Sequence, residues 1–298
     1  RMVESKKFTD YLFECVNLLL LTLLTICCLY PCLYVLWASL SEPVQLYTGS
    51  KVLLWPRGFN TGAFMLVFKN PNIWMGYRNT LLYVVAGTAL GMLLCILGAF
   101  VLSRSRFPGQ SFFMTVLIIT MFFGGGLIPT YVVMQSYGLL NTVWSQILLG
   151  SMSTYNLILV MSYFRSIPES LEESAHLDGA SDWVTLWKIY VPLSVPSLAV
   201  VALYFIVAKW NNWMTSAIYL TKRSLFSLQL ILKEILISGN TEAAGMENSV
   251  SGGAADYQAY SEAVKYATII ASTIPVLCIY PFLQRFFVKG VMLGAIKG

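Results

Sequence analysis

Residues 172–196 read EESAHLDGASDWVTLWKIYVPLSVP, a charged segment with a helical pattern that separates two strongly apolar stretches. These stretches lie near 142–164 and 194–220, and each is long enough to cross a membrane as an α-helix of roughly 20 residues. A connection this hydrophilic belongs outside the hydrocarbon. The segment is therefore predicted to face water between two membrane spans.

Two short helices joined by a bend are predicted here. Ser166 and Glu169 have the Ser-x-x-Glu spacing of a capping box, which predicts that a helix begins at this point. Asp178 and Gly179 should end it, because glycine readily adopts the left-handed conformation that closes a helix. Ser181 can then cap a second helix. We call residues 165–192 the elbow loop.

The second helix of the elbow loop should have one apolar face. Residues at i, i+3, i+4 and i+7 form this face, namely Trp183, Leu186, Trp187 and Tyr190. Pro192 and Pro196 then end the helix and begin the next span. Two interpretations are open: a solvated loop that joins two spans, or a rigid knob on which a soluble partner docks. We favour the knob, because a simple connection needs neither two capped helices nor a bend.

The rest of the chain has the composition of a membrane protein. Hydrophobic residues make up 57% and charged residues 11% of the 298, with a mean hydropathy of +0.69, whereas soluble domains have about 25% charged residues. The apolar runs lack the period-two alternation of transmembrane barrel strands. We therefore predict an all-α membrane protein, a bundle of six transmembrane helices near 12–40, 79–102, 111–135, 142–164, 194–220 and 263–288.

We expect a single transmembrane domain over residues 1–298, with outer loops at about 41–78 and 221–262. Basic residues crowd the helix ends on the side of the N-terminus, which places both termini in the cytoplasm. The net charge of +5 fits this orientation, and no array of basic and aromatic residues suggests nucleic acid. The six cysteines lie in or beside apolar runs and are predicted to be small core residues.

Two further stretches predict irregular structure. FFGGGLIP at 122–129 indicates either a broken helix beside a pathway or close packing of helices through small residues. Residues 238–265 are rich in glycine, serine and alanine and poor in large apolar groups, so they cannot bury a core. We expect this second stretch to be mobile or ordered by a partner.

The elbow loop resembles the EAA motif of ABC importer permeases. The resemblance rests on Glu173, Ser174 and Ala175, then Asp178, Gly179 and Ala180, then the downstream VPLSVP. Ser174 stands where the motif has its middle alanine. The length, the six predicted spans and the tail FFVKGVMLGAIKG at 286–298 extend the likeness to the MalG-like carbohydrate family, in its LplC/YtcP-like branch.

This resemblance implies an importer subunit in the bacterial cytoplasmic (inner) membrane. Its expected partners are a homologous second permease chain, two ATPase subunits and an extracytoplasmic sugar-binding protein, with an oligosaccharide as substrate. ATP and Mg²⁺ would bind in the ATPase, and this chain would hold no cofactor. The coupling residues carried over are Glu173, Ser174, Ala175, Asp178, Gly179 and Ala180, and the tail contact comprises Lys289, Gly290 and Lys297.

The fifth span contains the polar stretch AKWNNW, with Lys209, Trp210, Asn211, Asn212 and Trp213. It lies more than roughly 20 Å along a helix from Pro196. In one interpretation these residues line the substrate pathway, and Lys209 then favours acidic oligosaccharides such as those containing uronate. In the other, Lys209 reaches toward the outer headgroups and the tryptophans form an interfacial belt.

Other functional classes find little support. His176 has no recognisable nucleophile or carboxylate partner, and the chain contains no GxxxxGK[ST] sequence, so we predict neither an enzyme nor a metal site. An ion-gradient-driven secondary transporter is the alternative function. Such transporters usually carry acidic residues within their spans. Here the one acidic residue inside a predicted span is Glu14, near the start of the first.

Overall fold

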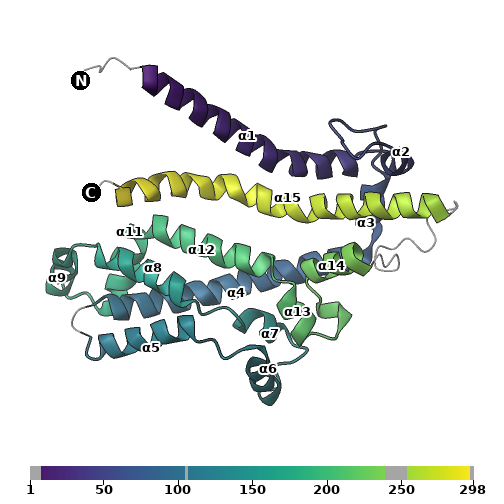
Figure 1. Ribbon diagram of the computed structural model, residues 1–298. Coiled ribbons are helices and arrows are strands. Elements are labelled where there is room, and N and C mark those ends of the chain that lie inside the picture. The colour runs from purple at the N-terminus through teal and green to yellow at the C-terminus, as the bar shows by residue number, and fades with distance from the viewer. Residues whose placement is uncertain (1–7, 105–106, 239–253, 296–298) are drawn as a thin grey trace. The chain divides into compact units, whose positions relative to one another are not determined.

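The computed structural model describes residues 8–104, 107–238 and 254–295, and the remaining residues are drawn in grey in Figure 1. Within these ranges the chain is helical and has no strand beyond an isolated bridge between Ser41 and Phe59. The all-α expectation is confirmed. The chain divides into two compact units, residues 1–70 with 235–273 and residues 71–234 with 274–298, which are described separately. The expectation of a single domain stays a prediction.

The first unit contains α1 (Phe8–Ser39), α2 (Pro43–Thr48), α3 (Gly62–Lys69) and the first part of α15 (Ala254–Ala295). Tyr34 of α1 meets Tyr266 of α15 edge to face, with ring centroids 5.9 Å apart. The Tyr47 hydroxyl donates to Oε1 of Gln258 at 3.0 Å. Most of the apolar surface of α1 is exposed, as expected of a helix in lipid.

The second unit is built around α4 (Pro71–Ser103), which packs against α7 (Val143–Leu148), α8 (Thr154–Arg165) and α12 (Val195–Trp210) (Figure 1). Its core brings large side chains from three helices together, among them Phe100, Leu157, Phe164 and Phe205. Gly91 lets α4 approach closely, since a Cβ there would lie 2.8 Å from the Phe205 ring. Of the six cysteines, Cys95 is buried in this core, whereas the other five are exposed on helix faces.

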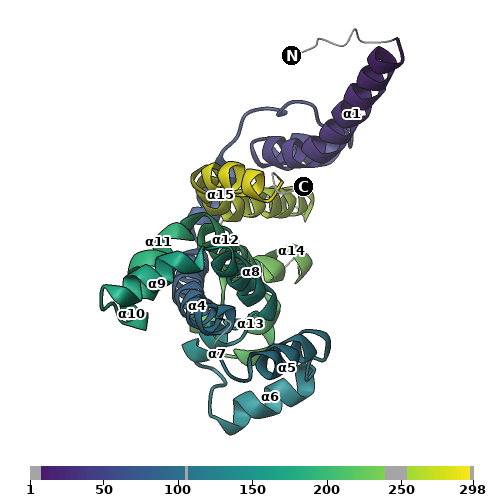
Figure 2. The same ribbon diagram turned by 90° about the vertical axis from the view of Figure 1, so that its left-hand side faces the viewer.

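All six predicted apolar segments are mainly helical where the structure describes them, but three of them contain a non-helical break. The third comprises α5 (Gln110–Phe122) and α6 (Leu127–Ser136), which meet at 113° (Figure 2). Gly126 has φ +84° at this bend, so the break predicted from FFGGGLIP is confirmed, whereas its place beside a pathway stays a prediction. The fourth is divided between α7 and α8, and the fifth between α12 and α13 (Met214–Tyr219).

Among the described helices, some are long and apolar enough to cross a membrane. Residues 10–39 of α1 and the whole of α4 are each long and apolar enough to cross a membrane. The pair α5 and α6, and the pair formed by residues 182–193 with α12, pass the same test when each bent pair is taken together. The described residues thus contain between two and four candidate spans by this measure.

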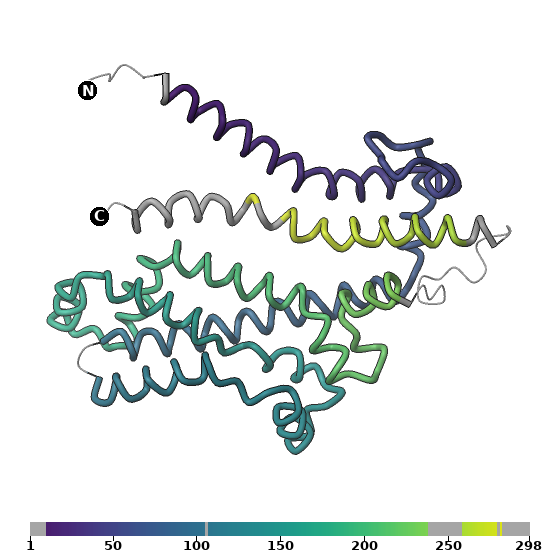
Figure 3. Tube along the Cα trace, in the orientation of Figure 1, coloured from purple at the N-terminus to yellow at the C-terminus, as the bar shows by residue number. Residues whose placement is uncertain are grey.

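The connection after α13 is ordered against α4 and does not form an open loop. Asn79 donates from Nδ2 to the carbonyls of Ser224 and Phe226 at 2.9 and 3.0 Å, and the Tyr83 hydroxyl donates to the carbonyl of Leu225 at 2.7 Å. The chain continues into α14 (Leu228–Ser238). The stretch expected to be mobile falls largely on residues 239–253, outside the described residues (Figure 3).

The bend at Gly126 gives a test of the fold. We expect Gly126→Ala to lower the free energy of unfolding by about 1–3 kcal/mol, because a φ of +84° combined with a ψ of 170° lies in a region that is essentially restricted to glycine. Gly124→Ala is the matched control, since a Cβ there meets nothing within 4 Å and its φ is not left-handed. Thermal unfolding of both variants in detergent measures the difference, and equal melting temperatures would contradict the assignment.

Candidate functional site

The predicted elbow is present. Helix α9 (Glu169–Leu177) ends at Asp178, and Gly179 follows with φ +79°. The amides of Gly179 and Ala180 donate to the carbonyls of His176 and Ala175 at 3.0 and 2.9 Å, which is the Schellman pattern of helix closure. Ser181 then caps the next helix and accepts from the Val184 amide at 3.4 Å.

The capping box predicted for the start of α9 is wrong. Ser166 belongs to the end of α8, where its hydroxyl donates to the carbonyl of Tyr163 at 2.7 Å. Pro168 occupies the N-cap position of α9 and provides no side-chain hydrogen bond. The serine lies close enough to α8 for its hydroxyl to donate to a carbonyl of that helix. Sequence spacing alone does not distinguish this role from an N-cap of α9.

The second arm of the elbow is less regular than a single helix. It consists of α10 (Asp182–Thr185), a π-helical turn (Leu186–Tyr190) and α11 (Val191–Leu193). The arm meets α12 at 83°. The wider π turn changes the angular spacing that a 3.6-residue period assumes. As a result the predicted apolar face is divided: Leu186 and Tyr190 are buried, whereas the Trp183 and Trp187 side chains are exposed.

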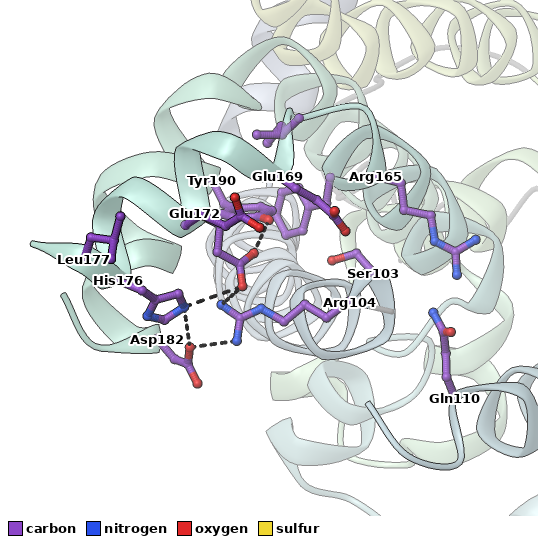
Figure 4. A pocket seen from close by; sticks show the side chains of 13 residues that line it. Ser103, Arg104, Gln110, Arg165, Glu169, Glu172, His176, Leu177, Asp182 and Tyr190 are labelled. Carbon is purple, nitrogen blue, oxygen red and sulfur yellow. Dashed lines mark hydrogen bonds and ion pairs between the residues drawn. The ribbon is translucent and has the colours of Figure 1, made fainter. Parts of the chain in front are cut away.

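Arg104 fastens both arms of the elbow to the end of α4 (Figure 4). Its guanidinium lies 3.1 Å from Oε1 of Glu172 in α9 and 2.7 Å from Oδ1 of Asp182 in α10. The same group stacks on the Phe100 ring of α4, 4.1 Å from the centroid. Because the Arg104 and Glu172 side chains are only 20% and 17% exposed, water screens this pair less than an open surface pair.

Glu172 also joins the elbow to the core. The Tyr190 hydroxyl donates to Oε2 of Glu172 at 2.7 Å, and its ring meets Phe100 and Phe164 edge to face. Burial, followed by the bond to Glu172, raises the pKa of Tyr190 far above its ordinary value, so the hydroxyl remains a donor. His176 Nε2 lies 3.6 Å from the Glu172 carboxylate, on the outer side of the group. We call Arg104, Glu172, Asp182 and Tyr190 the elbow anchor.

The residues carried over from the EAA motif lie on the outside of this anchored structure. Glu173, Ser174, Asp178 and Gly179 are exposed, and Ala175 and Ala180 are partly buried. Leu177 projects beside them with 89% of its surface exposed (Figure 4). A cavity of about 1020 Å³ lies beside α9, and its lining includes Glu173 and Leu177 as well as Arg104, Glu172 and Asp182 of the elbow anchor. The geometry thus presents a small projecting surface on a fixed base, which supports the knob interpretation.

The AKWNNW stretch is less open than expected. Lys209 and Trp210 are buried, and Asn212 Oδ1 accepts from the Thr215 amide in the first turn of α13 at 3.0 Å. The Trp213 ring is covered on one face by the Lys233 ammonium, 3.3 Å from the centroid. Asn211 is exposed. Contact between these residues and a substrate stays a prediction.

The tail contact also stays a prediction. Lys289 and Gly290 lie within α15, whose backbone is described there but whose side chains are not. Lys297 lies outside the described residues. Among the described residues no group of three or more His, Cys, Asp or Glu side chains is placed to hold a metal ion.

The elbow anchor was not predicted from the sequence. The sequence predicts Tyr190 only as part of an apolar face, and it assigns no role to Glu172. Arg104 lies 68 residues before Glu172 and has no local pattern that marks its partner. A basic residue directly after a long apolar helix was the available signal, and it indicates membrane orientation equally well.

Removal of the anchor should loosen the elbow while the core stays folded. We expect Arg104→Gln to reduce local stability by about 2 kcal/mol, because hydrogen bonds to charged groups contribute about that much. The amides of residues 169–193 should then exchange faster with deuterium than in the parent chain. Arg165→Gln is the control, since Arg165 is an exposed arginine outside the anchor. Equal exchange in the two variants would contradict the role of Arg104.

Comparison with known proteins shows the family of this chain. The model of the family described as "Binding-protein-dependent transport system inner membrane component" matches residues 107–293. The polygalacturonan/rhamnogalacturonan transport system permease protein YtcP of Bacillus subtilis is 36% identical over 93% of this chain and 96% of its own length. Protein LplC of the same organism is 32% identical over 96% of this chain and 95% of its own. A solved chain of a bacterial ABC transporter involved in the import of the acidic polysaccharide alginate has a TM-score of 0.87 and 32% identity, and the match covers 96% of this chain and 100% of that one. The chain belongs to the family of inner membrane components of binding-protein-dependent transport systems.

Proposed function

We propose that this chain is a permease subunit of an ATP-driven importer that takes up oligosaccharides, with uronate-containing chains as the favoured class. The observation that carries the proposal is the likeness along almost the whole chain to the solved alginate importer subunit. YtcP, named for polygalacturonan and rhamnogalacturonan, supports the same substrate class, since all three polymers contain uronate. Family membership makes the chain a transport component of the inner membrane, and not an enzyme.

The proposed assembly contains a second homologous permease, two ATPase subunits and an extracytoplasmic binding protein. ATP and Mg²⁺ bind in the ATPase subunits, and both termini of this chain lie in the cytoplasm with the elbow loop. The residues Lys289, Gly290 and Lys297 supply a second contact with the ATPase. Family membership implies ATPase and binding-protein partners, and so displaces the alternative of an ion-gradient-driven transporter.

The elbow anchor suggests how movement reaches the membrane. A partner that contacts the exposed residues Glu173, Asp178 and Gly179 moves α9 and α10 together, because Arg104 forms an ion pair with a carboxylate of each helix. Arg104 directly follows α4, which packs on α8 and α12. Movement of the knob thus moves α4, the central helix of the second unit. A flexible loop would not transmit this movement.

Substrate class is tested with the complete reconstituted transporter. We expect binding protein loaded with an oligogalacturonate to stimulate the ATPase rate at least about tenfold more than binding protein loaded with a neutral oligosaccharide of equal length. A tenfold ratio corresponds to about 1.4 kcal/mol. ATPase activity without binding protein is the control. Equal stimulation by both ligands would contradict the uronate preference, and none by any sugar would contradict the proposed function.

Coupling is tested at Gly179, where the φ of +79° and not lack of space limits the side chain. We expect Gly179→Val to lower uptake at least about tenfold, since a β-branched residue is strained by more than about 1 kcal/mol in this conformation. Gly179→Asn should retain uptake within about twofold, because asparagine tolerates the left-handed region. Uptake and ATPase activity are measured together in vesicles with equal amounts of assembled complex, and equal uptake by the two variants would refute the coupling role.

A further inference from the structure

Lys209 is a charged residue that lies buried in the second unit. It lies in the last turn of α12, 9% exposed, in a segment that we assign to the membrane. Its ammonium donates to the carbonyl oxygens of Gln146, Ile147 and Leu149 at 2.8, 2.9 and 2.6 Å. An ammonium has three donors, and here three carbonyls accept from it.

These carbonyls belong to the break in the fourth apolar segment. Helix α7 ends at Leu148, α8 begins at Thr154, and Gly150 between them has φ +74°. The last carbonyls of a helix have no partner within the helix, and hydrocarbon supplies none. The end of α7 is also the negative end of its dipole, which favours a cation. Lys209 therefore supplies hydrogen-bond donors to the carbonyls at the end of α7, and the Ser151 hydroxyl donates to one of them, that of Ile147.

The ammonium has no carboxylate partner among the residues that the structure describes. None of the ion pairs found there includes Lys209. Its neighbours are instead neutral: the Gln146 side chain donates to Ser145 Oγ and accepts from Ser216 Oγ, each at 3.1 Å. Carbonyl dipoles thus stabilise the charge, and the polar groups around it bond to one another.

Gly87 of α4 makes room for the lysine stem. A Cβ at this position would lie 2.8 Å from Cε and 3.1 Å from Nζ of Lys209. Lys209 therefore joins three elements: it belongs to α12, lies against a glycine of α4, and bonds to the end of α7.

We propose that Lys209 is a positioning residue for transport, an internal cation that holds the α7–α8 break in one geometry through the three carbonyls and does not touch the substrate. This assignment takes the place of the expectation that Lys209 selects anionic ligands. It rests on the proposed function only where transport is the readout. Its structural part is measured on the purified chain, so the two proposals can fail separately.

The first experiment is a double-mutant cycle on melting temperature. Gly87→Ala should lower the melting temperature of the parent chain, because the new methyl displaces Lys209. In the Lys209→Ala background the same change should cause no decrease, because the stem is gone. Gly98→Ala is the control, since its Cβ would meet only the flexible end of Leu157 and should have the same effect in both backgrounds. Additive effects of Gly87→Ala and Lys209→Ala would overturn the proposal.

The second experiment separates positioning from selection by charge. Lys209→Met in the complete transporter should reduce uptake of a neutral oligosaccharide and of a uronate chain of equal length by the same factor. In Lys209→Ala, propylammonium should restore part of both rates, because it returns the ammonium to the carbonyls. Loss confined to the uronate ligand, or unchanged uptake of both ligands, would overturn the proposal.

If the lysine variants do not assemble, Gly87→Ala alone still tests the idea, because it retains the charge and alters only its position. It should reduce uptake of both ligands by the same factor. Normal uptake of both, with a normal melting temperature, would overturn the positioning role.

Discussion

Hydrocarbon offers no hydrogen-bond partner, and each place where a helix breaks in this chain must therefore satisfy its backbone from within. The Lys209 ammonium does so at the end of α7. In the connection after α13, the Asn79 amide and the Tyr83 hydroxyl likewise donate to the backbone carbonyls of residues 224–226. Polar side chains of α4 and α12 thus satisfy backbone carbonyls in two places where helices of the second unit end.

The elbow was accessible to sequence reasoning because its determinants are local. Gly179 and Ser181 act on residues within one turn of themselves, and both behave as predicted. The glycines of FFGGGLIP likewise predict a break, although not its angle. The break between α7 and α8 was missed, since Gly150 is a single glycine in an apolar run and its stabilising partner lies about 60 residues away.

Long-range partners mark the limit of such reasoning. Arg104 and Glu172 are 68 residues apart, and the sequence gives no reason to pair them over other charges at the same membrane face. The polar AKWNNW stretch shows the converse problem. Its composition suggests a surface that binds a ligand, whereas Lys209 and Trp210 are buried. A short stretch of sequence does not reveal which of its side chains are packed against other parts of the fold.

The exposed Leu177 at the end of α9 has a consequence for assembly. A leucine in water that becomes fully covered by another protein contributes about 1.5–3 kcal/mol, equivalent to roughly ten- to hundredfold in affinity. Because the elbow anchor already fixes the helix that carries it, little conformational entropy opposes this burial. An association that buries this side chain is thus expected to weaken under conditions that weaken the hydrophobic effect, cold among them.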